Sequence, residues 1–437
     1  MCVSFALRRG RLATAPARAG LVFALSVFAL FLPVHAAPGA AAQLSFEEAV
    51  ALAGRGAPTL ESRSANIDAA REEAARADEL PDPQLMVGIE NMPVSGSGAF
   101  RPNGDDMTMK KIGLMQSFPA RAMREARQLI ADRQLERAQA LSAIEQLEVQ
   151  EQAAQAWLAT WAAQRETDSY AALREQAAVA VKVAKARLSA GTGSAVDAMA
   201  AQAAALEVEN RVDAAQARLQ AARASLARWL GLPSEQLPAV GAAPTLTELP
   251  FAEQVLLSTI DRQRELLDWR YREAIAEAEI ALASADKRPD WSIAAAYGQR
   301  DGSRADMVMV EFRVGLPLFS RNRQDRAIAA RRAQLASVVA EREDARRAQK
   351  EAIERALAEW RGLKQQVERK ESQILPLARD RSETAVAVFG GGGPLQPWLE
   401  ARRNELEIHV EHARHLGELG RVWAALAYLL PREETAR

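Results

Sequence analysis

The pattern that dominates the chain is helical, and it continues for longer than a globular domain requires. Strong helix formers, mainly Ala, Glu, Gln and Arg, fill residues 120–188, and neither Pro nor Gly interrupts them. At a rise of ~1.5 Å per residue, a helix over this stretch is on the order of 100 Å long. Residues 320–388 repeat the pattern, interrupted only by Gly362 and Pro376. This composition predicts two long helical shafts or coiled coils.

Four shorter stretches alternate between apolar and other side chains, which predicts β-strands. They lie at about residues 84–92, 107–118, 290–299 and 306–317. Each is roughly ten residues long, the length that a membrane-spanning strand requires. The alternative is a pair of amphipathic hairpins packed on a soluble core. The neighbouring segments are all long helices, so the sequence offers no obvious core for such hairpins.

The two faces of these strands differ in chemistry. In the clearest strand, the residues predicted to share an apolar face are Val308, Val310, Phe312, Val314 and Leu316. The residues predicted to share the opposite face are Met307, Met309, Glu311, Arg313 and Gly315. Lys111 falls on the corresponding mixed face of the strand at 107–118, together with Gly113 and Ser117.

The second half of the chain repeats the first. Residues 118–119 (FP) correspond to 316–317 (LP), and residues 227–233 (ARWLGLP) to 425–431 (ALAYLLP), both at an offset of 198 residues. A constant offset over this distance indicates duplication. We therefore expect a mostly α fold with four strands per chain. The expected parts are a first repeat at 37–233, a linker at 234–248, a second repeat at 249–431 and a C-terminal tail at 432–437.

Residues 1–36 have the features of a secretory signal peptide. Four arginines precede an apolar run at 21–32, and small residues precede the expected cleavage site after Ala36. Cleavage removes those arginines and takes the formal net charge from −1 to −5, because residues 1–36 contain no acidic residue. It also removes Cys2, the only cysteine, so we expect no disulfide or thiolate metal site in the mature chain.

The turn after the first long helix carries the family signal. Residues 187–197 (RLSAGTGSAVD) form an R-x-x-x-G-x-x-S-x-x-D motif from Arg187, Gly191, Ser194 and Asp197. With the duplicated plan of strand hairpin, long helix, turn and returning helix, this motif resembles the periplasmic tip of the TolC-like outer-membrane factor family. Residues 85–119 resemble the heavy-metal efflux branch of that family. The resemblance covers nearly all of residues 44–431.

The resemblance implies an assembly and a role. Three chains would form a homotrimer with a 12-stranded β-barrel in the outer membrane, continuous with an α-helical tunnel through the periplasm. It would be a passive efflux conduit for heavy-metal cations, working with a periplasmic adaptor (membrane fusion) protein and an inner-membrane resistance-nodulation-division pump. Lys111, Glu311 and Arg313 would face the barrel lumen. The residues implied in adaptor contact at the tips are Arg187, Gly191, Gly193, Ser194, Asp197, Gly390 and Gly391.

The second tip, at residues 389–400 (FGGGGPLQPWLE), departs from the family pattern of two acidic residues after the glycine. Pro397 stands where the first acid is expected, and Glu400 stands at the second. Three copies of Glu400 would form a carboxylate ring at the tunnel entrance and favour cations. The alternative is that Glu400 pairs with Arg402, Arg403 or a neighbouring helix.

No catalytic motif occurs in the sequence, and we expect neither enzymatic activity nor a cofactor. His409, His412 and His415 are candidate metal ligands, since imidazole suits Zn, Cu and Ni. Their spacing of three rotates each by about −60° on a helix, which favours a polar stripe over one shared site. Met307 and Met309 are weak candidates for Cu(I) or Ag(I), with apolar filling as the alternative.

Two other functions fit the same pattern. A channel of this family can serve drug or other small-molecule efflux. A periplasmic adaptor or structural protein also uses helical hairpins, but adaptors usually flank one hairpin with compact β-domains, whereas this chain has two hairpins.

Overall fold

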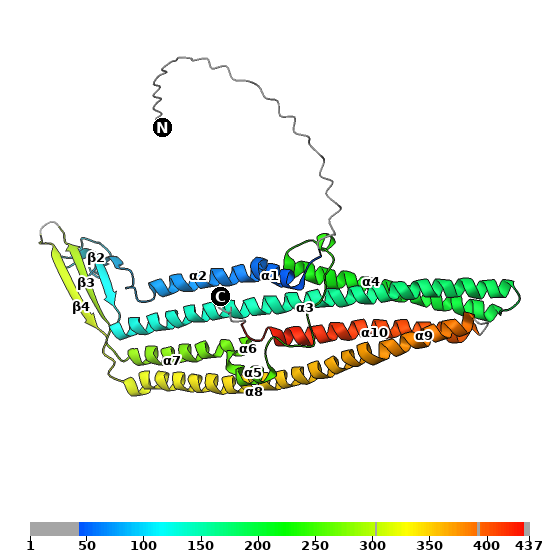
Figure 1. Ribbon diagram of the computed structural model, residues 1–437. Helices are drawn as coiled ribbons and strands as arrows, with labels where there is room; N and C mark the ends of the chain where they lie inside the picture. The colour runs from blue at the N-terminus through cyan, green and yellow to red at the C-terminus, as the bar shows by residue number, and fades with distance from the viewer. Residues whose placement is uncertain (1–42, 302–303, 391–393, 432–437) are drawn as a thin grey trace, which may run out of the picture. The chain divides into compact units, whose positions relative to one another are not determined.

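The computed structural model describes residues 43–301, 304–390 and 394–431, which form one unit of long helices with a small sheet. The mostly α fold with four strands is confirmed (Figure 1). The predicted leader at 1–36, the tail at 432–437 and Gly391 lie outside the described residues.

The first half of the chain forms two short helices, a strand hairpin and a long helical hairpin. Its elements are α1 (Phe46–Gly56), α2 (Pro58–Arg76), β1 (Gln84–Glu90), β2 (Met109–Phe118), α3 (Arg121–Ser189), α4 (Ala195–Leu230) and a 3-10 turn (Ser234–Gln236). α1 begins at a capping box, in which Ser45 Oγ accepts a hydrogen bond from Glu48 N (3.2 Å) and Ser45 N donates to Glu48 Oε2 (3.1 Å).

The second half follows the same plan with more interruptions. Its elements are α5 (Glu253–Ser258), a 3-10 turn (Ile260–Arg262), α6 (Arg264–Leu267), α7 (Trp269–Ala285), β3 (Trp291–Gln299), β4 (Met307–Val314), a 3-10 turn (Ser320–Asn322), α8 (Gln324–Arg369), a π-turn (Lys370–Ile374), α9 (Leu375–Gly390) and α10 (Leu395–Ala427). Among the described residues, the helices are either too short or too polar to cross a membrane.

The second long helix covers nearly all of the shaft predicted at 320–388, but its hydrogen-bond pattern changes on the way. The backbone is helical from Gln324 to Gly390, with the π-turn between α8 and α9, and Pro376 lies two residues beyond that turn. Proline has no N–H to donate to the carbonyl four residues earlier, and its ring clashes with that carbonyl. A π-turn is one way in which a helix accommodates such a break. The first shaft has no proline and runs unbroken as α3 for 69 residues.

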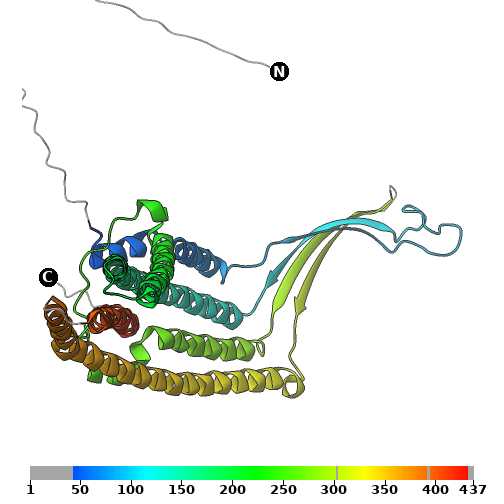
Figure 2. The same cartoon turned by 90° about the vertical axis from the view of Figure 1, so that its right-hand side faces the viewer.

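The four strands form one antiparallel sheet in the order β1-β2-β3-β4. The central pair, β2 and β3, joins the two repeats, and Phe118 stacks on Trp291 across it with ring centroids 4.0 Å apart. β1 and β4 each pair with one neighbour only, so each leaves one edge of the sheet unpaired in the single chain. Figure 2 shows the sheet extending beyond the ends of the helices.

β1 and β4 end slightly earlier than the sequence pattern predicted. β4 stops at Val314 rather than near 317: Gly315 N still donates to Asp290 O (2.8 Å), the next pair in register, but Pro317 cannot donate to the ladder. β1 stops at Glu90, followed by Asn91 with φ +57°, a left-handed conformation that an extended strand does not contain.

Two tryptophans anchor the long helices at equivalent places in the two repeats. Trp157 Nε1 on α3 donates to Leu44 O (3.1 Å), and Trp360 Nε1 on α8 donates to Leu246 O (3.0 Å). Both rings are buried in the main hydrophobic core, where Phe46 packs edge-on against Trp157 at 5.5 Å. Each anchor satisfies a buried donor and fixes its long helix to the segment that begins the repeat.

Farther toward the tips, a buried carboxylate holds three helices together. Glu166 on α3 is only 5% exposed and accepts from Arg218 on α4 (2.9 Å) and from Arg414 on α10 (2.7 Å). Removing either arginine leaves the buried charge with less compensation. This cluster therefore ties α10 to the α3–α4 hairpin.

Candidate functional site

The apolar strand positions share one face of the sheet, which we call the outer face. The strand register places on it Leu85, Val87, Ile89, Ile112, Leu114, Phe118, Trp291, Ile293, Tyr297, Val308, Val310, Phe312 and Val314. Most of these side chains are exposed in the single chain; Val308 and Val310, for example, are 75% and 70% exposed. The same face also carries Lys110, Gln116 and Gln299. An exposed, mostly apolar surface of this kind marks a contact with lipid or with another protein.

The opposite face, which we call the inner face, has small, polar and methionine side chains. Its members are Gln84, Met86, Gly88, Glu90, Met109, Lys111, Gly113, Met115, Ser117, Ser292, Ala294, Ala296, Gly298, Met307, Met309, Glu311 and Arg313. The structure thus brings the three residues predicted to line a lumen onto one face. The ions pair locally: Lys111 Nζ lies 3.4 Å from Glu90 Oε2, and Arg313 Nη2 donates to Glu311 Oε2 (3.0 Å).

The middle of the inner face is formed by small residues because the strands approach closely there. A Cβ added to Gly113 would lie 2.6 Å from Ala296 Cβ, a distance that real side chains do not reach. Gly113 is therefore required at this position for β2 and β3 to pair.

The first tip is a tight turn between α3 and α4 that its own side chains close. Thr192 N donates to Arg187 O (2.9 Å), and Gly191 adopts φ +73°, which favours glycine. Ser194 Oγ accepts from Asp197 N (3.0 Å), while Ser194 N donates to Asp197 Oδ2 (3.4 Å). The residues implied by the family motif therefore build the turn itself.

Gly193 permits the close return of the chain at this tip. A Cβ at Gly193 would lie 2.9 Å from Arg187 Cβ, so any larger residue forces the turn to open. The Arg187 side chain lines a hollow on the surface beside this turn.

The second tip is built differently. Phe389 near the end of α9 stacks on Trp398 in the first turns of α10, with ring centroids 5.1 Å apart and an angle of 11° between the rings. Gly390 ends α9, and the glycines at 391–393 lie outside the described residues. The sequence alone did not reveal this aromatic pair, although both residues stand at the ends of the helices that flank the glycines.

Glu400 of the second tip faces a hollow that residues of the first tip also line. Its Oε1 accepts from Gln396 Nε2 (3.1 Å), a bond along the first turns of α10. It lines this hollow, of about 340 Å³, together with Arg187, Asp197 and Arg403. Both tips of one chain therefore contribute charged groups to one recess.

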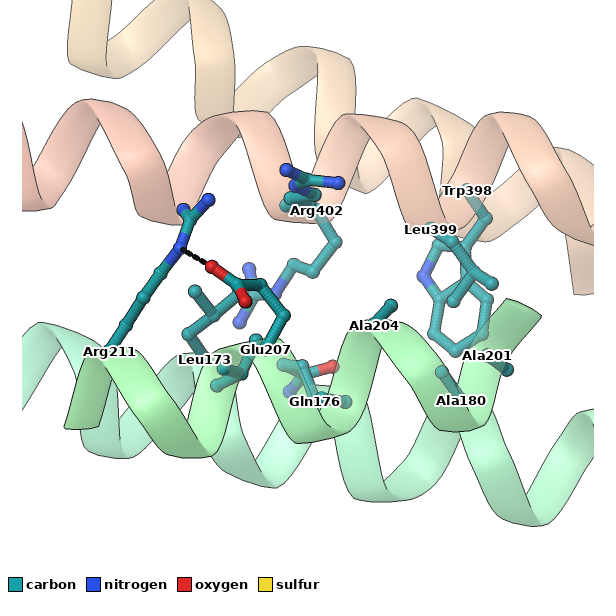
Figure 3. A pocket seen from close by; sticks show the side chains of 13 residues that line it. Leu173, Gln176, Ala180, Ala201, Ala204, Glu207, Arg211, Trp398, Leu399 and Arg402 are labelled. Carbon is teal, nitrogen blue, oxygen red and sulfur yellow. Dashed lines mark hydrogen bonds and ion pairs between the residues drawn. The ribbon is translucent and has the colours of Figure 1, made fainter. Parts of the chain in front are cut away.

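A second, mostly apolar hollow lies between the α3–α4 hairpin and α10, shown in Figure 3. Ala180, Ala201 and Ala204 face Trp398 and Leu399 across about 120 Å³ of free space. Side-chain packing between the first hairpin and the start of α10 is thus looser than in a closed protein core.

The three histidines lie on α10, and His412 is the buried one of the three. Its Nε2 lies 3.2 Å from Glu371 Oε1 on the π-turn, and the neighbouring Lys370 Nζ lies 2.8 Å from Glu411 Oε2. Burial lowers the pKa of His412. The negative charge of Glu371 acts in the opposite direction, and the positive charge of Arg165 lowers the pKa further. Within the described ranges, no three side chains of the His, Cys, Asp or Glu type are placed to hold a metal ion.

Neither a family model nor a curated protein sequence matches the chain, but solved structures do. A membrane protein from Pseudomonas aeruginosa aligns with a TM-score of 0.75 at 17% identity, over 90% of this chain and 91% of that one. CusC, described as forming a transmembrane channel, aligns at 0.72 and 15% identity, over 88% and 92%. The Campylobacter jejuni CmeC outer membrane channel aligns at 0.71 and 12% identity, over 89% and 87%. At these identities the likeness establishes the fold, and the chain has the fold of outer-membrane channel subunits.

Proposed function

We propose that three copies of this chain form a TolC-like outer-membrane channel that serves as the exit conduit of a tripartite efflux system. The observation that carries this proposal is the sheet, which has an exposed apolar outer face, a mixed inner face and two unpaired edges. The names of the similar structures, CusC and the CmeC outer membrane channel, support the same location and role.

The unpaired edges supply the argument for a closed ring of copies, and the family resemblance sets their number at three. In lipid, every backbone polar group must be hydrogen-bonded within the protein, so an open sheet cannot span a membrane. Pairing β4 of one copy with β1 of the next removes the edges only when the ring closes. Three chains with four strands each give 3 × 4 = 12 strands, an even number that suits a membrane barrel.

The helices would then continue the conduit into the periplasm. We assign residues 1–36 to a signal peptide, and 37–233 and 249–431 to the two repeats with 234–248 as their linker. The tips, at 187–197 and 389–400, would contact a periplasmic adaptor that links the channel to an inner-membrane resistance-nodulation-division pump. The conduit itself is passive, so no catalytic or cofactor chemistry is required of it.

Within the conduit, Lys111, Glu311 and Arg313 would line the barrel lumen. Three copies of Glu400 would surround the entrance, where confined carboxylates favour cations over anions. Heavy-metal cations are the proposed cargo, supported by the resemblance of residues 85–119 to the metal-efflux branch and by the methionines of the inner face.

The test compares neighbouring positions on opposite faces of β4. Val310→Arg places a charge on the outer face, where an arginine facing lipid near the bilayer centre costs about 2–4 kcal/mol. We expect this variant to lose the heat-resistant trimer in outer-membrane fractions. Glu311→Arg, on the inner face, should assemble normally and alter ion selectivity in planar bilayers.

Three results would count against the proposal. Chemical cross-linking of the detergent-solubilised protein that yields only monomers or dimers argues against the shared barrel. Loss of the trimer in Glu311→Arg but not in Val310→Arg reverses the assignment of the two faces. A protein that fractionates as a soluble periplasmic monomer supports an adaptor-type role instead.

A further inference from the structure

The strand methionines are all on the inner face of the sheet. The register places there Met86, Met109, Met115, Met307 and Met309. No strand position of the outer face carries methionine; its apolar members are Leu, Val, Ile, Ala, Phe, Trp and Tyr. If methionine served only as apolar filling, the outer face would be its expected place, because that face is the more apolar of the two.

Three of these methionines surround Gly298, near the end of β3. Met307 is the ladder partner of Gly298 on β4. A Cβ added to Gly298 would lie 3.2 Å from Met109 Sδ and 3.3 Å from Met309 Cε. Thioether side chains from β2 and β4 therefore occupy the space that a side chain at Gly298 would take.

The charges around this cluster cancel. Lys111, the β2 partner of Gly298, pairs with Glu90, and Glu311, two residues beyond Met309, pairs with Arg313. Hard divalent cations prefer carboxylate and carbonyl oxygens, and here Glu90 and Glu311 already have cationic partners, while Asp306 accepts from Tyr297 Oη and Arg300 N. Thioether sulfur is a soft ligand that selects Cu(I) over hard ions.

We propose that Met109, Met307 and Met309 form a binding site for a soft monovalent cation, Cu(I) or Ag(I), on the inner face of the sheet. The site rests on the proposed channel function and specifies its cargo class. It lies at the end of the strands that adjoins the loops at 91–108 and 300–306. A set of thioethers without thiolate or imidazole suits a conduit, because cargo must leave as readily as it enters.

The test replaces sulfur while keeping volume. The site variant combines Met109→Leu, Met307→Leu and Met309→Leu, since Leu and Met exchange with little change in packing. The matched control combines Met115→Leu, Met123→Leu and Met199→Leu, which removes the same number of thioethers away from Gly298. Recovery of the heat-resistant trimer in both variants verifies assembly.

The first measurement is block of single-channel current in planar bilayers, with silver nitrate as the probe in chloride-free electrolyte. We expect the half-blocking concentration of Ag(I) to rise about tenfold or more in the site variant, equivalent to about 1.4 kcal/mol, and to stay unchanged in the control. Zn(II) should block the current of the parent, the site variant and the control to the same extent. Equal Ag(I) block in the parent and the site variant would overturn the proposal.

The second measurement separates the site from the channel. Silver K-edge X-ray absorption on the purified protein should show sulfur neighbours in the parent and the control, and lose most of that signal in the site variant. If no protein conducts current, the channel proposal fails, and the absorption spectra still decide the site. A sulfur signal that persists in the site variant would refute the site even in a working channel.

Discussion

The two repeats keep the same anchors near the core and differ at their far ends. Trp157 and Trp360 make equivalent hydrogen bonds to Leu44 O and Leu246 O, at 3.1 and 3.0 Å. The first tip is closed by a capping box at Ser194, whereas at the second tip Phe389 stacks on Trp398 between the ends of α9 and α10. The contacts that fix the long helices are thus alike in the two repeats, while the contacts at the tips differ.

The shafts also differ in their hydrogen-bond pattern. α3 is α-helical up to the first tip, whereas the second shaft contains the π-turn shortly before Pro376. Lys370 and Glu371 of that turn pair with Glu411 and His412 on α10.

The largest expected effect tests the equivalence of the anchors. Trp157→Ala and Trp360→Ala should each lower the free energy of unfolding by about 3–5 kcal/mol, because each opens a cavity in the main core. Trp→Phe at either position should cost less, since part of the ring stays in the core; the loss of the bond to the buried carbonyl contributes about 1–3 kcal/mol. Urea denaturation of the purified protein measures both.

Leu206→Ala on α4 is the matched control, because Leu206 is 62% exposed in the single chain. It should change the stability by about 0.5 kcal/mol or less. A severe loss at one tryptophan and none at the other would show that only one repeat is anchored in this way.

The next effect concerns the first tip. Ser194→Ala removes the N-cap of α4 and should destabilise it by about 0.5–2 kcal/mol. Hydrogen exchange at the amides of the first turn of α4 should accelerate accordingly. Ser194→Asp, which can still accept from the backbone, should restore most of the protection; equal exchange in both variants would mean that the cap does not hold this turn.

At the second tip, we expect hydrogen exchange to depend on the aromatic stack and not on an N-cap side chain. Phe389→Ala removes the stack on Trp398, which is worth about 0.5–1.5 kcal/mol beyond the buried area. Hydrogen exchange at residues 385–389 and 396–400 should accelerate, while α4 keeps its protection. Phe389→Tyr keeps the ring and serves as the control. If hydrogen exchange is unchanged in Phe389→Ala, the aromatic stack does not stabilise the second tip and does not distinguish it from the first.

The smallest expected effect is a pH dependence of stability from His412 on α10, which faces Glu371 of the second shaft. Burial lowers the pKa of His412, so between its ordinary value of ~6.5 and the lower folded value the unfolded chain binds more protons. Stability from this group is therefore full above pH ~6.5 and declines as the pH falls through that window. His412→Gln should flatten this part of a stability–pH profile. A slope identical to that of the parent would exclude His412 as its source.

Sequence periodicity identified the local elements well. The change of period from helix to strand located all four strands, and the serine–glutamate spacing at Ser45 and Glu48 matches the capping box that begins α1. Both signals depend on residues close together in the chain. The second shaft forms as a helix over 324–390, but composition did not reveal its π-turn, which lies just before Pro376, a residue that cannot donate a backbone hydrogen bond.

What the sequence determined by itself is therefore the set of helices and strands, the duplication, and the two chemically distinct faces of each strand. Only the tertiary structure decided which residues from different elements meet. Strand register brought Met109, Met307 and Met309 around Gly298, and helix packing brought Glu166 to its arginines on α4 and α10. Periodicity gives the face of one strand or helix, but the alignment between elements depends on interactions that are distant in the sequence.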